Sequence, residues 1–229
     1  MLASQVFAIS SGVADREQVH KTWLSINRYL KDEKSGGFRL NTDFGALCLD
    51  LGRAFGFTYG DKENGAFFNH MVVMLANALY KRGWAKEGFE VLTSVYKMAT
   101  NSAAKIYPVL PEYFNNEGKG LYLYLTGSAS WYIYTLLEEV LGLKFYLGDL
   151  YLGPKLIAPN FFKHKISAQF NWQNKRIKIE FIKETDSAHP YRIRRVFLNQ
   201  KNILPAGLRY VIKKKSLRRK HNLVLVYLG

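Results

Sequence analysis

The sequence predicts a mainly α-helical chain that is followed by an all-β domain. Apolar residues recur at helical spacing before Gly142, and the period of the pattern changes to two after it. Charge follows a similar division, because residues 1–154 hold 15 basic and 15 acidic side chains whereas residues 155–229 hold 18 basic and 3 acidic ones. We therefore expect a helical domain over residues 1–145 and a basic β domain over residues 146–229.

The helical part contains a predicted hairpin. An amphipathic helix is expected over residues 14–30, and residues 38–60 predict an ordered loop with a short helix near its centre. Residues 64–81 are apolar on almost every side of a helix, which marks a buried helix. Residues 85–98 carry charge on one side only, so these last two segments predict one inner and one outer helix.

The same order then repeats once, with a loop at residues 107–120 and a largely apolar helix at residues 128–141. Alternating inner and outer helices indicate part of a helical toroid, although two hairpins are too few to close one. Short β-rich segments follow, separated by turn residues, as in a small antiparallel β domain. They are residues 165–172, 175–182, 191–198, 208–213 and 222–228. Most of the basic side chains are expected on the solvent face of these strands.

Composition excludes several classes of protein. A single cysteine, Cys48, cannot form an internal disulfide, and no Cys/His cluster has zinc-ligand spacing, which indicates a reducing, cytoplasmic location. The first residues lack the features of a signal peptide, and the apolar stretch at residues 67–79 is too short and too polar to cross a bilayer. The common hydrolase, nucleotide-binding and metalloprotease motifs are absent. We therefore expect no membrane partner and no metal.

A first candidate site lies in the segment DKENG, residues 61–65, together with His70. Charges, an amide and a glycine precede the buried helix, and His70 is expected about two turns into it. Such a cluster suits a hydroxyl-rich or anionic ligand, because histidine can donate one or two hydrogen bonds. The alternative is that Asp61 and Glu63 only favour the start of the helix, and that His70 is a hydrogen-bonded core residue.

A second candidate site is the segment LTGSASW at residues 125–131. Small residues at the start of a helix leave backbone N–H groups uncovered, and these groups together with the helix dipole form an anion site. Thr126 or Ser128 can cap the helix. The alternative is an ordinary cap with small residues for close packing.

The third candidate consists of the basic runs at residues 213–215 and 218–220, which could neutralise the phosphates of a nucleic acid. Tyr191, Phe197 and Trp172 could stack on bases, but no RNP-like aromatic motif is present. A solvated strand face explains the charges more simply. A nucleic-acid partner is therefore not favoured.

Taken together, several segments resemble a known family. GFRLNTDFG (37–45), LGRAFGFTYGDKENGAFFNHM (51–71), PEYF…YLTGSASW (111–131) and LGLKFYLGDLYLGPKL (141–156) are similar to the C-terminal part of the cellobiose-phosphorylase-type enzymes of glycoside hydrolase family 94. Among the branches of this family, these segments are most similar to the 1,2-β-oligoglucan phosphorylases. The resemblance is specific because KENGAxFxH and LTGSASW occur together and in this order.

This resemblance implies an (α/α)6 toroid combined with β domains, and an inverting phosphorylase reaction. Inorganic phosphate, the co-substrate, cleaves a β-glucosidic bond, here of β-1,2-glucooligosaccharides, and releases α-glucose 1-phosphate; no cofactor is implied. The residues that match the family's phosphate ligands are His70, Thr126 and Gly127. Lys62 and Glu63 match residues at the sugar subsites.

The general acid of the family is an aspartate far earlier in the barrel, and this chain has only 69 residues before His70. Asp43 and Asp61 belong to other matched segments, so no catalytic residue is assigned. The sequence therefore indicates a C-terminal fragment of a glycoside phosphorylase, active when a complementary N-terminal chain supplies the acid. The alternatives are an inactive sugar- or phosphate-binding remnant, and a basic β domain that binds a polyanion.

Overall fold

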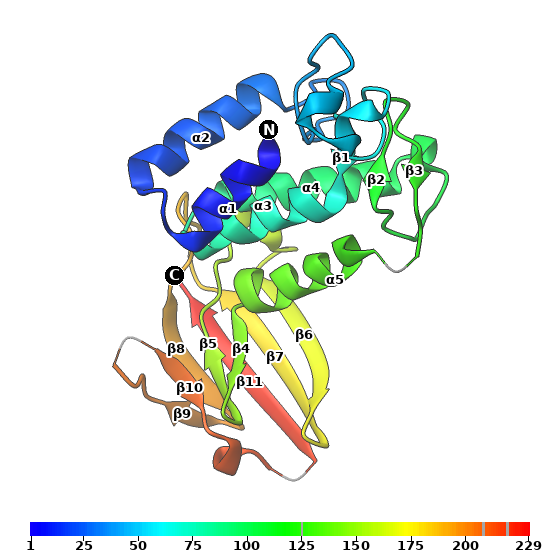
Figure 1. The fold of residues 1–229 in the computed structure, drawn as a ribbon. Coiled ribbons are helices and arrows are strands. Elements are labelled where there is room, and N and C mark those ends of the chain that lie inside the picture. Colours follow the sequence, from blue (N-terminus) through cyan, green and yellow to red (C-terminus); the bar gives the residue numbers. More distant parts are fainter. Residues whose placement is uncertain (125, 208, 219) are drawn as a thin grey trace. The chain divides into compact units, whose positions relative to one another are not determined.

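The computed structural model describes residues 1–124, 126–207, 209–218 and 220–229. The chain divides into two compact units, Met1–Thr135 and Leu136–Gly229. The long helices belong to the first unit and the two larger sheets to the second (Figure 1). The predicted order, helices first and sheets afterwards, is thus confirmed.

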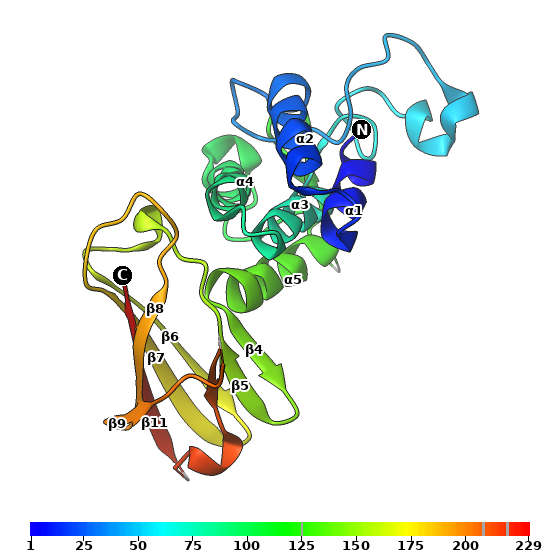
Figure 2. The same cartoon turned by 90° about the vertical axis from the view of Figure 1, so that its left-hand side faces the viewer.

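Helix α3 is the centre of the first unit, and it contacts α1, α4 and α5 (Figure 2). It is buried on most of its faces, including Val72, Leu75, Leu79 and Tyr80, as predicted for the inner helix of a hairpin with α4. The helices are α1 (Leu2–Ser11), α2 (Arg16–Tyr29), α3 (Asn69–Lys81), α4 (Ala85–Thr100) and α5 (Gly127–Tyr134), with a π-helical turn at Thr135–Val140. Short 3-10 helices lie at Leu49–Leu51, Arg53–Gly56 and Ser102–Ala104.

The start of α3 differs from the prediction, because the helix begins at Asn69 rather than at residue 64. Gly65 has a left-handed backbone with φ of +75°, which no right-handed helix contains. After it, the chain forms β1 (Phe67–Phe68), which pairs with β2 (Tyr113–Phe114); β2 in turn pairs with β3 (Gly120–Leu121). Neither this small sheet nor α1 was predicted from the sequence.

The second unit contains two sheets. Strands β10, β5 and β4 form the smaller one in that order, and the larger one has the order β6-β7-β11-β8-β9. Short 3-10 helices lie at Ala158–Asn160 and Lys214–Ser216. The strands are β4 (Leu143–Tyr146), β5 (Asp149–Leu152), β6 (Lys165–Trp172), β7 (Lys175–Lys183), β8 (Ile193–Leu198), β9 (Lys201–Ile203), β10 (Tyr210–Ile212) and β11 (His221–Leu228). Of the segment predicted at residues 208–213, Leu208 lies outside the described residues.

The larger sheet is mixed, so the expectation of a wholly antiparallel β domain is wrong for one pair. Strand β11 pairs antiparallel with β8 but parallel with β7. The reason is topological, since the chain passes through β8, β9 and β10 before β11 returns beside β7. Alternation along a single strand does not reveal which strand becomes its neighbour.

Apolar side chains alternate with polar ones along β7 as predicted. Ile177, Ile179 and Phe181 are fully buried, whereas Arg176 and Lys178 are exposed. The corresponding face of β6 carries the half-buried rings of Phe170 and Trp172, which contact the exposed ring of Phe145 on β4 at centroid distances of 5.8 and 4.8 Å. The basic side chains of β7 thus lie on the solvent face.

A buried carboxylate lies in the π-helical turn at the start of this unit. Glu139 is 0% exposed and accepts hydrogen bonds from the ammonium groups of Lys144 (2.8 Å) and Lys155 (2.5 Å). A buried ion pair of this kind fixes local geometry rather than adding much stability, because desolvation offsets the attraction. It ties the π-helical turn to β4 and to the segment after β5.

The backbone of Gly142 packs closely against that of Gly153, and this contact can be tested by substitution. It has φ of +63°, and a Cβ there would stand 2.0 Å from the carbonyl carbon of Gly153. We expect Gly142→Ala to lower the free energy of unfolding by about 1–3 kcal/mol, as measured by urea denaturation. Gly153→Ala is the matched control, because nothing lies within 4 Å of its added methyl group. Equal effects of the two substitutions would show that the close approach at Gly142 does not exist.

Candidate functional site

The first turns of α3 and α5 are held together by one carbonyl group. The oxygen of Pro111 accepts a hydrogen bond from Asn69 Nδ2 (3.0 Å) and another from Ser128 Oγ (2.9 Å). The backbone N–H of Asn69 also donates to the carbonyl of Glu112 at 2.8 Å. Two helix N-termini, each with the positive end of its dipole and uncovered N–H groups, are thereby placed side by side.

His70 and Gly127 meet where these helices begin. A Cβ built on Gly127 would stand 2.7 Å from Cε1, 2.9 Å from Nδ1 and 3.0 Å from Nε2 of His70. Only glycine leaves room for the imidazole ring at this distance. The structure therefore brings together two of the three residues predicted to bind phosphate. The expectation that His70 lies two turns into its helix is wrong, because α3 begins only one residue earlier.

Thr126, the third of these residues, is the N-cap of α5, as the sequence suggested. Its Oγ1 accepts a hydrogen bond from Ser128 N at 3.2 Å and lies 2.9 Å from Ser128 Oγ. A Thr hydroxyl in this position satisfies one of the uncovered helix donors. Leu125, which completes the predicted motif, lies outside the described residues.

The imidazole of His70 has hydrogen-bonding capacity that the protein leaves unused. Its Nε2 is buried and has no hydrogen-bond partner among the described residues. One side of the ring faces Trp131 of α5, at a centroid distance of 6.1 Å. Because a buried polar atom without a partner is costly, an oxygen of a bound ligand would satisfy it. The alternative interpretation of His70 as a hydrogen-bonded core residue does not account for this atom.

Lys62 lies against aromatic rings. Its ammonium group is 4.6 Å from the ring centroid of Phe57 and 5.4 Å from that of Tyr122. Both Lys62 and Tyr122 have positive φ angles, +47° and +57°, which are uncommon for such side chains. Tyr122 in turn contacts the ring of Tyr113, which stacks on Phe68 immediately before α3. These rings connect the Lys62 turn to the start of α3.

Glu63 is exposed, and among the described residues its side chain forms no hydrogen bond or ion pair with His70, Thr126 or Gly127. Its charge contributes, after burial and the charge of Asp61, to the raised pKa of Tyr113. Its backbone lies in a tight turn, since Asp61 and Asn64 form an isolated β-bridge around it.

A buried amide holds this turn in place. Asn41 is 0% exposed; its Oδ1 accepts from Gly65 N at 2.8 Å, and its Nδ2 donates to Asn64 Oδ1 at 3.0 Å. The side chain of Asn64 donates in turn to the carbonyl of Phe57 at 2.7 Å. The amide groups of Asn41 and Asn64 thus fix both the turn that carries Lys62 and the backbone of Phe57, whose ring the Lys62 ammonium group contacts.

Arg39 also supports this turn, through the carbonyl group of Gly65. Its Nη1 donates to the carbonyl of Gly65 at 3.0 Å and to Asn116 Oδ1 at 2.7 Å, and its Nη2 pairs with Asp32 at 3.2 Å. Burial raises the pKa of Asp32, but hydrogen bonds from Ser35 and the Arg39 guanidinium outweigh it and hold the pKa below its ordinary value. Asp32 is therefore ionised at neutral pH and orients Arg39.

Sequence reasoning missed three residues that shape the site. No pattern in the sequence marks Tyr122 as a site residue. Its contact with Lys62 depends on its positive φ angle, which the sequence does not reveal. Asn41 and Pro111 lie inside segments that carry the family resemblance, but no local pattern shows that either makes several hydrogen bonds.

Burial raises the pKa of Tyr113, so its phenol is a neutral donor beside the rings of Phe68 and Tyr122.

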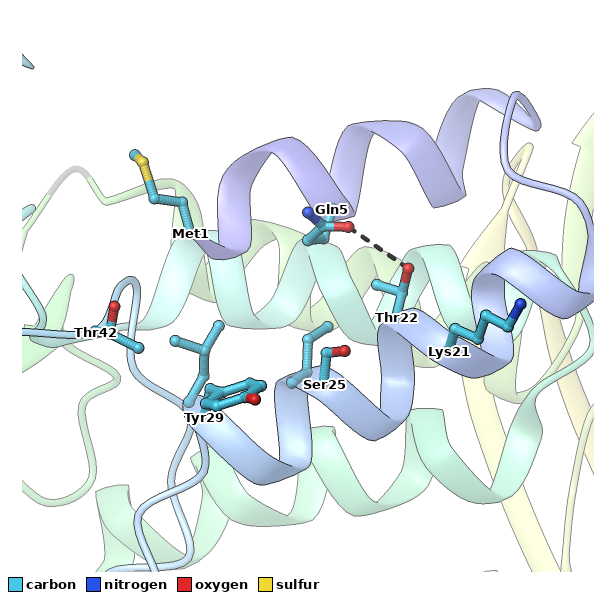
Figure 3. A pocket seen from close by; sticks show the side chains of 9 residues that line it. Met1, Gln5, Lys21, Thr22, Ser25, Tyr29 and Thr42 are labelled. Carbon is cyan, nitrogen blue, oxygen red and sulfur yellow. Dashed lines mark hydrogen bonds between the residues drawn. The ribbon is translucent and has the colours of Figure 1, made fainter.

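A separate hollow of about 460 Å³ lies between α1 and α2 in the same unit. Figure 3 shows Gln5 and Thr22 pointing toward each other across it, and Thr22 Oγ1 lies 3.5 Å from Gln5 Oε1. Lys21 is the one charged side chain in its lining, and none of the predicted site residues belongs to it. This groove is therefore distinct from the candidate phosphate site.

Within the described ranges, no group of three or more His, Cys, Asp or Glu side chains is arranged to hold a metal ion. The helices of those same ranges include none that is long and apolar enough to cross a membrane.

The contact between His70 and Gly127 can be measured by a double-mutant cycle. We expect Gly127→Ala alone to lower the free energy of unfolding by about 1–3 kcal/mol, because the new methyl group collides with the imidazole. In a His70→Ala background most of that cost should disappear, since the ring is gone. An equal cost in both backgrounds would contradict the contact. Urea denaturation measures all four proteins.

The catalytic-domain profile of the Glycosyl hydrolase 94 superfamily matches residues 1–142. No curated protein matches the sequence. Solved structures that match include the family GH92 α-mannosidase of Bacteroides thetaiotaomicron in complex with mannoimidazole, which is 10% identical over 98% of this chain and 23% of that chain, with a TM-score of 0.29. A second structure of that enzyme is 10% identical over 93% of this chain and 32% of that chain, with a TM-score of 0.27. This chain thus spans a third or less of those structures, and likenesses this weak carry no conclusion about its fold.

The family match, in contrast, covers residues 1–142, which is more than half of the chain. The chain therefore belongs to the Glycosyl hydrolase 94 superfamily, and the matching part is the catalytic domain of that superfamily.

Proposed function

We propose that this chain contributes the phosphate-binding site and part of the sugar-binding site of an inverting glycoside phosphorylase. The observation that carries the proposal is the buried, unpartnered Nε2 of His70 beside Gly127, where two helix N-termini meet. The reaction is cleavage of β-glucosidic bonds, with β-1,2-glucooligosaccharides as the proposed substrates, by inorganic phosphate to give α-glucose 1-phosphate. In this proposal α3, α4 and α5 are parts of the inner and outer layers of an (α/α)6 toroid.

The chemistry explains why an anion cradle is needed. In an inverting hydrolase a second carboxylate activates water on the face of the sugar opposite the general acid. Phosphate is already an anionic nucleophile, so the protein has only to hold it in line behind the anomeric carbon. The imidazole N–H of His70 and the N–H groups at the start of α5 supply donors for its oxygens.

Lys62 suits the sugar side of the proposed site. Its ammonium group lies between two ring faces, which restricts its position and leaves its N–H groups available for ring hydroxyls. The half-exposed ring of Tyr122 offers an apolar surface for a sugar face next to it. We include Glu63 as a hydroxyl acceptor on the resemblance alone.

Protonation of the leaving oxygen needs a general acid, and the family resemblance assigns that role to none of the carboxylates in residues 1–229. We propose that the acid comes from a segment outside these residues, carried either by a longer form of the chain or by a complementary chain. The second candidate function is binding of sugar or phosphate without catalysis, which the unpartnered Nε2 of His70 beside Gly127 supports equally.

Phosphate binding is testable without any partner. Titration with inorganic phosphate should shift the imidazole NMR signals of His70, because the anion supplies the missing acceptor for its N–H. Thr126→Val removes the cap hydroxyl and should weaken binding about tenfold, the equivalent of about 1.4 kcal/mol. Ser130→Ala, which removes an exposed hydroxyl from the same helix, is the control and should bind as the parent does. Unchanged His70 signals at saturating phosphate would remove this residue from the site.

Release of glucose 1-phosphate tests the whole proposal. We expect none from this chain alone with β-1,2-glucooligosaccharides and phosphate, and release once the polypeptide encoded directly upstream is added, since the acid must come from outside. In that mixture His70→Ala should reduce the use of phosphate by about tenfold to a hundredfold, the value of one charge-assisted hydrogen bond of roughly 1.5–3 kcal/mol. Absence of release with a folded upstream polypeptide would favour the binding-only function.

A further inference from the structure

The solvent face of the larger sheet collects cationic and amide side chains, and it is not part of the site proposed above. Adjacent strands place these groups side by side: Arg176 on β7 is opposite His221 on β11, and Lys178 is opposite Gln169 on β6. They line a hollow of about 510 Å³, within the size range of small-molecule sites. We call this hollow the basic face; its lining residues are Gln169, Arg176, Lys178, Glu180, Asn199, Arg218, His221, Asn222 and Leu223.

The basic face has a positive field. Glu180 is the one carboxylate in its lining, and it pairs with both Lys178 (2.7 Å) and Lys165 (3.3 Å). Hydrogen bonding from Lys178 lowers the pKa of this carboxyl, so it is ionised and already neutralised at neutral pH. Arg176 and Arg218 have no carboxylate partner among the described residues, so their charge is available to a ligand.

The floor of the basic face is fixed by a buried amide. Asn222 is 4% exposed; its Oδ1 accepts from Arg218 N at 2.8 Å and from Asn199 Nδ2 at 3.0 Å, and its Nδ2 donates to Arg218 O at 3.2 Å. The backbone from which the Arg218 side chain extends is therefore held in one position relative to β11. Such preorganisation reduces the entropy lost when a ligand binds.

The rings on the solvent face of this sheet already contact other side chains. On the solvent face, the Arg195 guanidinium lies 4.5 Å from the ring centroid of Tyr227, and Phe197 meets the same ring edge-on at 5.9 Å. On β6, Phe170 and Trp172 lie on the opposite face of the sheet, the face of Ile177, and contact Phe145 there. Binding of single-stranded nucleic acid depends on open ring faces, so the basic face lacks that platform.

We propose that the basic face binds an acidic oligosaccharide that carries carboxylate groups. The guanidinium forks of Arg176 and Arg218 match planar carboxylates, and the amide of Gln169 and the imidazole of His221 suit the hydroxyls between them. A sugar chain needs no stacked base and lies flat over an open sheet. This site is independent of the phosphate site in the helical unit, so either can fail without the other.

The test uses the complete chain and hexagalacturonate as the probe, with binding measured by calorimetry at two salt concentrations. We expect binding that weakens as salt rises, because charged contacts release counterions. The double substitution Arg176→Gln/Arg218→Gln should weaken binding at least about tenfold. Lys214→Gln/Lys215→Gln removes the same charge from a neighbouring hollow and is the matched control; it should weaken binding less than threefold or so.

Each of the following results would overturn the proposal. Equal losses in the two double variants would show a general charge effect rather than a site. Equal binding of neutral maltohexaose would exclude a role for the carboxylates, and tighter binding of decauridylate at the same salt concentration would identify a nucleic-acid surface. Absence of hexagalacturonate binding by the folded parent chain would refute the proposal outright. Circular dichroism of both variants checks that the sheet is intact.

Discussion

The carbonyl group of Pro111 is the point on which the arrangement of the helical unit depends. By accepting hydrogen bonds from Asn69 and Ser128, it fixes the first turns of α3 and α5 against each other. Neither helix could move along its axis without leaving a buried donor unsatisfied, which costs more than the bond itself contributes. The contact between His70 and Gly127 follows from that constraint, because each residue lies within the first two positions of its helix. A short polar link thus determines where an anion can be held.

The same constraint places aromatic rings beside the Lys62 turn, on the proposed sugar side of the site. Pro111 lies two residues before the strand β2, which pairs with β1, and β1 leads into α3. The small sheet therefore brings Tyr113 onto Phe68 and Tyr122 onto Tyr113, and Lys62 lies over the last of these rings. On the opposite side of the turn, Asn41 and Arg39 satisfy its backbone. The unusual backbone at Lys62 and Tyr122 is tolerated because contacts on both sides determine it.

Much of this architecture could be predicted from the sequence, but its critical contacts could not. Periodicity predicted the helical hairpin and the alternation along β7, because burial on one face leaves a direct trace in the sequence. It misplaced the start of α3, since Phe67 and Phe68 extend the apolar pattern although they belong to a strand. It also missed the parallel pairing of β7 with β11, which depends on long-range topology. The proximity of His70 to Thr126 and Gly127 was predicted by family resemblance alone, because their separation of more than 50 residues leaves no local signal.

The two proposed sites would attract an anion in different ways. The first 154 residues hold equal numbers of basic and acidic side chains, so the candidate phosphate site depends on donors at hydrogen-bond distance and on two helix ends. The basic face depends on an excess of charge spread over a solvent-exposed sheet. Charges exposed to solvent are screened beyond about 8 Å at physiological salt, whereas buried donors are screened much less. If both proposals hold, the two surfaces select differently: the buried donors would recognise the shape of one small anion, and the exposed cations would recognise the charge density of an extended one.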